Sequence, residues 1–321
     1  MDRNRLILAI IFLLAIASTF IGIINISLYS TASKFSKQSG STFFGESGPG
    51  AALVRINGEI HAGKSGMDST GSESVLAQLE EIQNSRAIKG VLLEINSPGG
   101  SAAASQEIFN AVMELKKTKK VVVSMKDVAA SGGYYIAAAA DSIFAQHSTL
   151  TGSIGVIAVV PNLSGFLNQH GVKIKTYKAG KFKDILSMFR DSSQEEEMLI
   201  QKMLGDTYHK FIEDVARGRN RTVASIEELA QGRIYSGEDA FRNKLVDELG
   251  GRKEAMRKLA ELCQFEGEMP LYEHEDNPMD KLFKMLGAST NQISLVSAHN
   301  PVMLILPHSL RLTTEQLLQS R

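Results

Sequence analysis

The feature that most constrains the fold is an alternation of short apolar segments with amphipathic segments, which begins near Ala51. Short apolar runs rich in β-branched residues are typical of strands, whereas apolar residues spaced by three and four are typical of helices. The predicted strands are residues 52–60, 90–95, 120–125, 142–146 and 172–178. The predicted helices are residues 72–82, 105–117, 193–219 and 251–263. Because strands that alternate with helices form parallel sheets, the expected fold class is α/β, with repeated βα units and a mainly parallel sheet.

The composition is that of a globular protein, and it excludes several classes of function. Hydrophobic residues make up 43% of the 321 residues, which is enough for a substantial core. Lys plus Arg and Asp plus Glu both number 35, and no basic stripe is interleaved with aromatic residues, so nucleic acid is not an expected partner. A single cysteine, Cys263, excludes an internal disulfide, and the seven histidines show no metal-ligand spacing. We therefore expect no metal and no cofactor.

The N-terminal region contains an apolar segment, residues 6–28, that carries no charge and is long enough to cross a bilayer as a helix. Ala15 and Ala17 resemble the small residues of a signal-peptide cleavage site, but the apolar segment continues well beyond them. A retained transmembrane anchor is therefore the expectation, and cleavage is the alternative. With residues 1–5 in the cytoplasm, the rest of the chain would lie outside it.

The remainder of the chain divides by composition into three parts. Residues 29–50 are rich in Ser, Gly and Lys, which is typical of a flexible linker. The strand and helix patterns place the folded domain at residues 51–268. The C-terminal tail, residues 269–321, contains one short apolar segment bounded by prolines, and its role stays open.

Two glycine-rich segments follow neighbouring predicted strands. The first, "NSPGGS" at residues 96–101, is predicted to form a tight turn before a helix, and the second, "ASGGYY", contains Ser131. Parallel strands end at the same edge of a sheet, so the two loops are expected to face one spot. The backbone N–H groups of Gly100 and Gly132 would then form an oxyanion hole, each lowering a barrier by about 3 kcal/mol. The alternatives are an ordinary βα turn in the first segment and a helix-capping role for Ser131.

A serine nucleophile also needs a base. His147 and His170 lie in the right region of the chain but have no acidic partner at a recognisable spacing. The candidate lysines, which follow the predicted strand 172–178, are Lys178, Lys181 and Lys183. A lysine can act as a base near neutral pH only if it is desolvated, because the usual lysine pKa is about 10.4. Residues such as Phe182 and Ile185 would help to bury it at the sheet edge, although solvated surface lysines are the simpler interpretation.

The motifs "NSPGG", "ASGGYYIA", "TGSIGVI" and "GKFKDI", in this order after an N-terminal apolar span, resemble the signal peptide peptidase A family of Ser/Lys serine proteases (peptidase family S49). The resemblance covers residues 51–265 and implies a ClpP/crotonase-like fold. It also implies that Ser131 is the nucleophile, that Lys183 rather than Lys181 is the general base, and that Ser153 orients the base. The oxyanion amides fall on Gly100 and Gly132.

Members of this family with one copy of the domain form a ring in which serine and lysine come from adjacent subunits, so the resemblance implies a homo-oligomer, with an octamer expected. The implied function is a membrane-anchored serine endopeptidase that degrades remnant signal peptides and unfolded chains. Its partners would be peptides and, through the anchor, membrane lipid, with the catalytic domain on the outer face of the plasma or inner membrane. The alternatives are an acyl-CoA-processing enzyme of the crotonase-like fold and a non-catalytic membrane scaffold.

Overall fold

The computed structural model describes residues 48–66, 68–273 and 303–305. The predicted transmembrane segment 6–28, nearly all of the linker and most of the C-terminal tail therefore lie outside the described residues. Within the described ranges, no helix combines the length and the apolar character needed to cross a membrane.

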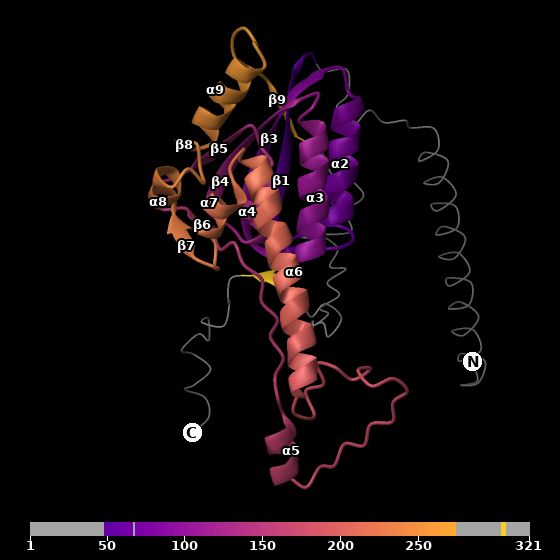
Figure 1. Ribbon diagram of the computed structural model, residues 1–321. Helices are drawn as coiled ribbons and strands as arrows, with labels where there is room; N and C mark the ends of the chain where they lie inside the picture. The colour runs from indigo at the N-terminus through magenta and orange to yellow at the C-terminus, as the bar shows by residue number, and fades with distance from the viewer. Residues whose placement is uncertain (1–47, 67, 274–302, 306–321) are drawn as a thin grey trace, which may run out of the picture. The chain divides into compact units, whose positions relative to one another are not determined.

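A mainly parallel β-sheet forms the centre of the folded domain (Figure 1). Its strand order is β2-β1-β3-β4-β5-β8, and each neighbouring pair on this path is parallel. These strands are β1 (Gly50–His61), β2 (Ser69–Gly71), β3 (Ile88–Ser101), β4 (Lys120–Ala130), β5 (Ser142–Ala145) and β8 (Glu248–Leu249). The prediction of an α/β fold with repeated βα units and a mainly parallel sheet is confirmed.

Four short strands extend this sheet. They are β6 (Leu150–Gly152), β7 (Ile234–Ser236), β9 (Leu271–Glu273) and β10 (Met303–Ile305). β6 runs parallel to the end of β4, and β7 runs antiparallel to β6. β9 runs parallel to the start of β1, whereas β10 runs antiparallel to the end of β3.

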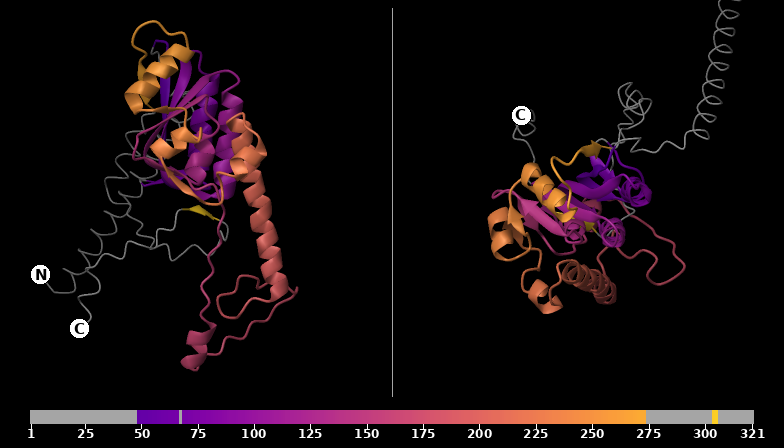
Figure 2. Two further views of the ribbon diagram at one scale, coloured as in Figure 1. Left: turned by 60° about the vertical axis from the view of Figure 1, so that its left-hand side comes forward. Right: turned by 90° about the horizontal axis from the view of Figure 1, so that it is seen from above.

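Helices cover both faces of the sheet (Figure 2). The helices are α2 (Ser72–Asn84), α3 (Ala102–Leu115), α4 (Gly132–Ala137), α5 (Ser164–Gln169), α6 (Gln194–Gly218), α7 (Val223–Glu227), α8 (Gly237–Arg242) and α9 (Arg252–Leu262). Alternate strand residues point to opposite faces, so one set, which includes Leu92 and Val122, packs against Leu259 of α9. The helices α2, α3 and α4 lie against the opposite face (Figure 1).

Residues 155–195, which we call the arm, have no hydrophobic core of their own. All of these residues are described, and none of them is buried. The arm contains α5 and leads into α6, whose buried apolar residues lie only in its C-terminal half, from Phe211 to Ala216. Figures 1 and 2 show α5 and the first turns of α6 beyond the end of the sheet.

Two local predictions are wrong. Residues 172–178 are not a strand: every residue from 171 to 180 is exposed, and none of the described strands pairs with this segment. Residues 96–101 are not a tight turn, because β3 continues to Ser101 and pairs with β1 at Gly99 and Gly100. The two glycines adopt φ values of 107° and 157°, which let the strand bend while it stays paired.

Candidate active site

Ser131 lies at the junction of β4 and α4, in a backbone conformation that serine rarely adopts. Its φ is 53° and its ψ is −118°, a region that costs a residue with a side chain about 1–3 kcal/mol. Neighbouring main chain holds it there, because the Ser131 N–H donates to the Gly152 carbonyl at 2.8 Å and the Tyr135 N–H donates to the Ser131 carbonyl at 2.9 Å. A strained serine at a sharp strand-to-helix turn is typical of a nucleophile in hydrolases.

The hydroxyl of Ser131 does not cap the helix that it precedes. Ser131 occupies the N-cap position of α4, yet its side chain makes no capping hydrogen bond. By contrast, Ser101 at the start of α3 and Ser193 at the start of α6 both accept a capping hydrogen bond. The interpretation of Ser131 as a helix cap is therefore wrong, and its hydroxyl is left for another use.

The glycine-rich ends of β3 and β4 meet beside Ser131, as the sequence predicted. A Cβ atom added to Gly132 would lie 3.3 Å from the Gly100 nitrogen and 2.4 Å from Ser105 Oγ. A Cβ atom added to Gly100 would lie 2.0 Å from the Ile60 carbonyl oxygen. Only glycine fits at either position, and the first N–H groups of α4 have no acceptor within the helix. The backbone N–H groups of Gly100 and Gly132 thus lie close together, and their role as an oxyanion hole stays a prediction.

Ser153 directly follows β6, the strand that pairs with the end of β4 leading to Ser131. Ala130 pairs with Gly152, so Ser153 leaves β6 at the same level as Ser131 leaves β4. Ser153 has a φ of 51° and is 8% exposed, and its N–H donates to the Arg233 carbonyl at 2.7 Å. Ser131, Ser153, Gly100 and Gly132 therefore gather at one edge of the sheet.

Lys183 does not join this group within the single chain. It lies on the arm, its side chain is exposed, and none of the described contacts connects it to Ser131 or Ser153. The prediction that this lysine is buried at the sheet edge is wrong for the chain alone. Phe182 and Ile185, which were expected to bury it, are themselves only half-buried.

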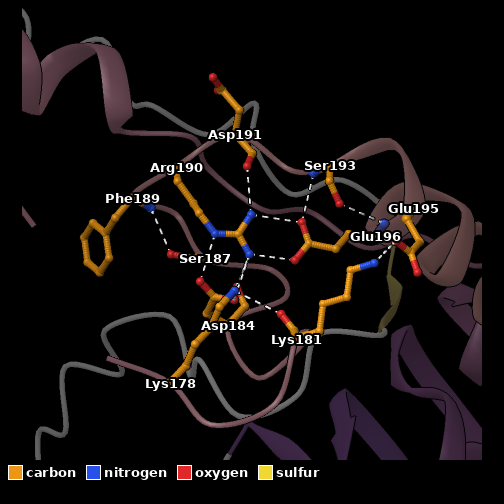
Figure 3. Close-up of polar contacts among 10 residues, drawn as sticks. All are labelled: Lys178, Lys181, Asp184, Ser187, Phe189, Arg190, Asp191, Ser193, Glu195 and Glu196. Atoms are coloured by element: carbon orange, nitrogen blue, oxygen red, sulfur yellow. Dashed lines mark hydrogen bonds and ion pairs between the residues drawn. The ribbon is translucent and has the colours of Figure 1, made fainter. Parts of the chain in front are cut away.

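The three candidate lysines differ in their partners (Figure 3). The Lys178 ammonium donates to the Asp184 carboxylate and to the Lys181 carbonyl, and the Lys181 ammonium pairs with Glu195. The Lys183 ammonium has no hydrogen-bond or ion-pair partner among the described residues. Lys183 is thus the one of the three whose amine is left available for a catalytic contact.

Among the described contacts, neither of the candidate histidines, His147 and His170, contacts Ser131. His147 pairs with Glu238 at 2.6 Å, an acid 91 residues away that no spacing in the sequence indicates, and the pair is exposed. His170 contacts the Phe166 carbonyl. Within the described part of the chain, no set of three or more His, Cys, Asp or Glu side chains is placed to hold a metal ion.

Sequence reasoning also missed a buried carboxylate, Asp214, that ties α6 to the nucleophile helix. Asp214 is 1% exposed and accepts hydrogen bonds from Tyr135 Oη at 2.6 Å and Lys210 Nζ at 2.9 Å. Burial alone raises the pKa of Asp214, but the hydrogen bonds from Tyr135 and Lys210 outweigh burial and the pKa is lowered. The signal in the sequence is the position of Asp214 between Phe211 and Val215 on the apolar face of a predicted helix.

Two family models match the chain. The model of peptidase family S49 matches residues 113–266, and the model of Clp protease matches residues 57–155. The second match agrees with the Clp protease-like part of the predicted fold. Together the two models span residues 57–266, which include most of the sheet, the strand ends at Ser131 and the arm.

Three curated proteins illustrate the similarity. The chain is 45% identical over 188 residues to a protein of Enterococcus faecium named signal peptide peptidase SppA, a match that covers 58% of this chain and 55% of that protein. It is 34% identical over 239 residues to a Synechocystis protein named as a protease, covering 74% of this chain and 83% of that protein. It is 36% identical over 210 residues to the chloroplastic serine protease SPPA of Arabidopsis thaliana, covering 64% of this chain and 31% of that protein. The chain thus spans little more than half the length of the first of these relatives.

Proposed function

This chain belongs to peptidase family S49, and from that premise we propose that it is a serine endopeptidase whose nucleophile is Ser131 and whose general base is Lys183. The observation that carries the proposal is the backbone of Ser131. A serine held at a φ of 53°, with no capping role and with glycine N–H groups beside it, has the geometry of a nucleophile rather than of a structural residue.

The proposed reaction proceeds through an acyl-enzyme. Ser131 Oγ attacks the peptide carbonyl carbon while its proton passes to Lys183 Nζ, and the Gly100 and Gly132 N–H groups stabilise the oxyanion. The proton then passes to the leaving amine as the peptide C–N bond breaks. Water next attacks the ester, again giving its proton to Lys183, and the proton returns to Ser131 Oγ as the acid product leaves. Ser153 would orient the lysine amine.

We propose that Lys183 reaches Ser131 from a second copy of the chain. The arm that carries Lys183 has no buried residue, and it presents large apolar side chains to solvent, among which Val159 and Tyr177 are 81% and 82% exposed. Such exposed apolar surface in a folded chain is typical of an interface. The assembly expected from the family resemblance is a homo-octameric ring, in which burial of the arm would also desolvate the lysine.

The proposed substrates are extended polypeptides, namely remnant signal peptides and unfolded chains. One edge of the β3 segment Gly99–Ser101 is paired with β1, and the other edge accepts an antiparallel strand, Met303–Ile305. This pairing supports a binding mode in which a substrate adds to the same edge through main-chain hydrogen bonds. A peptide bound there would lie beside the Gly100 N–H.

We also propose that residues 6–28 anchor the enzyme in the plasma or inner membrane, with the catalytic domain outside the cytoplasm. The length and the uncharged, apolar character of this segment support the anchor. An anchored peptidase on this side of the membrane would meet signal peptides where they are released.

The test is hydrolysis of a quenched fluorescent peptide with an alanine- and leucine-rich core by the full-length chain in detergent. Ser131→Ala and Lys183→Ala should each reduce hydrolysis at least about a thousandfold, because each removes a group that acts in the bond-making step. Lys181→Ala is the matched control and should keep activity within about threefold, because its ammonium is engaged by Glu195. Full activity in Lys183→Ala together with loss in Lys181→Ala would reject the assignment of the base.

A further inference from the structure

Charged groups surround the turn that carries Lys183, and none of its apolar side chains is fully buried. Main-chain hydrogen bonds from Lys183 to Gly180 and from Ile185 to Phe182 form the turn itself. The arm contains no buried residue, and the apolar side chains of this turn, Phe182 and Ile185, are only half-buried. The first buried side chain after the arm is that of Glu196, in the first turn of α6.

Arg190 contacts the residue that follows Lys183 through two parallel hydrogen bonds. Its Nε donates to Asp184 Oδ2 at 2.9 Å and its Nη2 donates to Asp184 Oδ1 at 2.9 Å. Nη2 also lies 3.2 Å from the Asp184 carbonyl oxygen. A bidentate arginine–carboxylate pair fixes orientation as well as distance, so Arg190 sets the position of the backbone next to Lys183.

The other side of the same guanidinium holds the start of α6 (Figure 3). Its Nη2 donates to Glu196 Oε1 at 2.6 Å and its Nη1 donates to Glu196 Oε2 at 2.9 Å. Glu196 in turn accepts from the Ser193 N–H at 2.8 Å and completes the capping box of α6. A single arginine thus joins the Lys183 turn to a rigid helix end.

The remaining charged groups around the turn complete the network. From the turn come Lys178, Lys181 and Asp184, and from the following segment and α6 come Arg190, Asp191, Glu195 and Glu196. The hydrogen bonds from Arg190 lower the pKa of Asp184 and lower that of Glu196 to about 2, while the two carboxylates raise the pKa of Arg190. Both carboxylates are therefore ionised throughout the pH range in which a lysine base would operate.

We propose that Arg190 is a positioning residue for Lys183: it holds the lysine-bearing turn against the first turn of α6 and keeps the Asp184 carboxylate occupied, so that the Lys183 ammonium stays unpaired. This inference rests on the proposed function, since it assigns Arg190 a role only if Lys183 is the base. Without Arg190, the Asp184 carboxylate would keep its contact with Lys178 but lose its bidentate partner, and the oxygen left without a donor, Oδ2, would become able to pair with the Lys183 ammonium.

The test measures kcat/KM against pH for full-length variants with the same quenched fluorescent peptide. Arg190→Ala should lower kcat/KM by about 10- to 100-fold through misplacement of the base, and should shift the acid limb of the profile to higher pH. Arg190→Lys should recover activity because it keeps the positive charge. The recovery should be only partial, since an ammonium cannot pair with both carboxylates in bidentate fashion. The matched control is Arg242→Ala, which removes an exposed arginine paired with Glu238 on α8 and should leave the profile unchanged.

A double variant separates the two parts of the proposal. Adding Asp184→Asn to Arg190→Ala removes the freed carboxylate, so the acid limb should return towards that of the wild type while kcat/KM stays low. An Arg190→Ala profile that matches the wild type in height and limb position, in a preparation where Lys183→Ala is inactive, overturns the proposal and leaves the proposed function standing. An active Lys183→Ala variant instead rejects the proposed function itself. A loss of activity in Arg190→Ala without a limb shift, unrelieved by Arg190→Lys, indicates a merely structural residue and also overturns the proposal.

Discussion

At the scale of single residues, the candidate site depends on two positions, Gly100 and Gly132, that have no side chain. Gly100 lies against the Ile60 carbonyl of β1 and Gly132 lies against Ser105 of α3, so neither position has room for a side chain. Ser105 Oγ is itself fixed by donating to the Ser101 carbonyl at 2.9 Å. The backbone donors are therefore positioned by steric fit before any substrate arrives.

This fit predicts the effect of adding one methyl group. Gly132→Ala places Cβ 2.4 Å from Ser105 Oγ and should lower the free energy of unfolding by about 1–3 kcal/mol through overpacking. Ser105→Ala in the same chain removes the clashing oxygen and should recover most of that loss in urea unfolding. Gly205→Ala, in α6 with no atom near the added Cβ, is the control and should stabilise the chain by about 0.5–1 kcal/mol. A double variant as unstable as Gly132→Ala would show that the contact with Ser105 is not the cause.

At the scale of elements, α6 connects two parts of the proposed mechanism. Its C-terminal half packs beside α4 through Phe211, which stacks on the Tyr135 ring at a centroid distance of 4.3 Å, and through Asp214. Its N-terminal end holds the arm through Glu196. The helix that follows the proposed base is thus anchored on the helix that follows the proposed nucleophile.

The buried carboxylate of Asp214 predicts that the free energy of unfolding depends on pH. Asp214→Asn should lower the free energy of unfolding by about 1–3 kcal/mol at neutral pH, because it weakens the hydrogen bonds with Tyr135 and Lys210. The pKa of Asp214 in the folded chain is below its ordinary value of 3.8, so its contribution is complete above that value and is lost as the pH falls through the folded-state pKa. The difference between wild type and variant in urea unfolding should therefore be constant from about pH 5 to 7 and shrink below about pH 4. Glu213→Gln, one residue away and exposed, should show no such difference.

The elements also show how far sequence could lead. Hydrophobic periodicity predicted the parallel sheet, α6 and α9, because burial in the chain's own core produces that pattern. The same alternation misled at residues 172–178, where apolar residues such as Ile174 and Tyr177 stay exposed. Glycine in "NSPGGS" was interpreted as a turn signal, although Gly99 and Gly100 lie in a strand whose close neighbour is what requires glycine.

For the candidate site, the sequence predicted which residues gather at the sheet, but it did not predict the charged contacts of the arm. Ser131, Gly132 and Ser153 follow strands that are neighbours in a parallel sheet, and Gly100 lies at the end of the next strand, so motif and topology together place them at one edge. The partners of Arg190 could not be predicted, because Arg190 and Asp184 lie in a segment without regular periodicity, and Glu196 follows Arg190 by six residues at the start of α6. The position of Lys183 relative to a serine on another copy could not be predicted either, because sequence periodicity reflects contacts within one chain.

At the scale of the whole molecule, the proposed dyad requires more than one chain, and mixing variants tests this directly. Ser131→Ala and Lys183→Ala chains, each inactive alone, should regain about a quarter of wild-type activity when assembled together in equal amounts, because about one neighbouring pair in four joins an intact serine to an intact lysine. Peptide hydrolysis by the mixed assembly, verified by differential tags, is the measurement. Replacing the Lys183→Ala partner by the double variant Ser131→Ala/Lys183→Ala should give no recovery. Mixed assemblies without activity would mean that the dyad forms within one chain.

The backbone of Ser131 has a consequence for how such a chain evolves. At a φ of 53° and a ψ of −118°, glycine has a lower conformational energy than any residue with a side chain. The substitution that would relieve the strain at this turn is therefore one that removes the hydroxyl. Selection for stability therefore favours glycine at this position, whereas selection for catalytic activity favours serine. While serine is retained there, other contacts in the fold must compensate for the strain. In a descendant that is not selected for peptide hydrolysis, this serine is the first site residue that we expect to be lost.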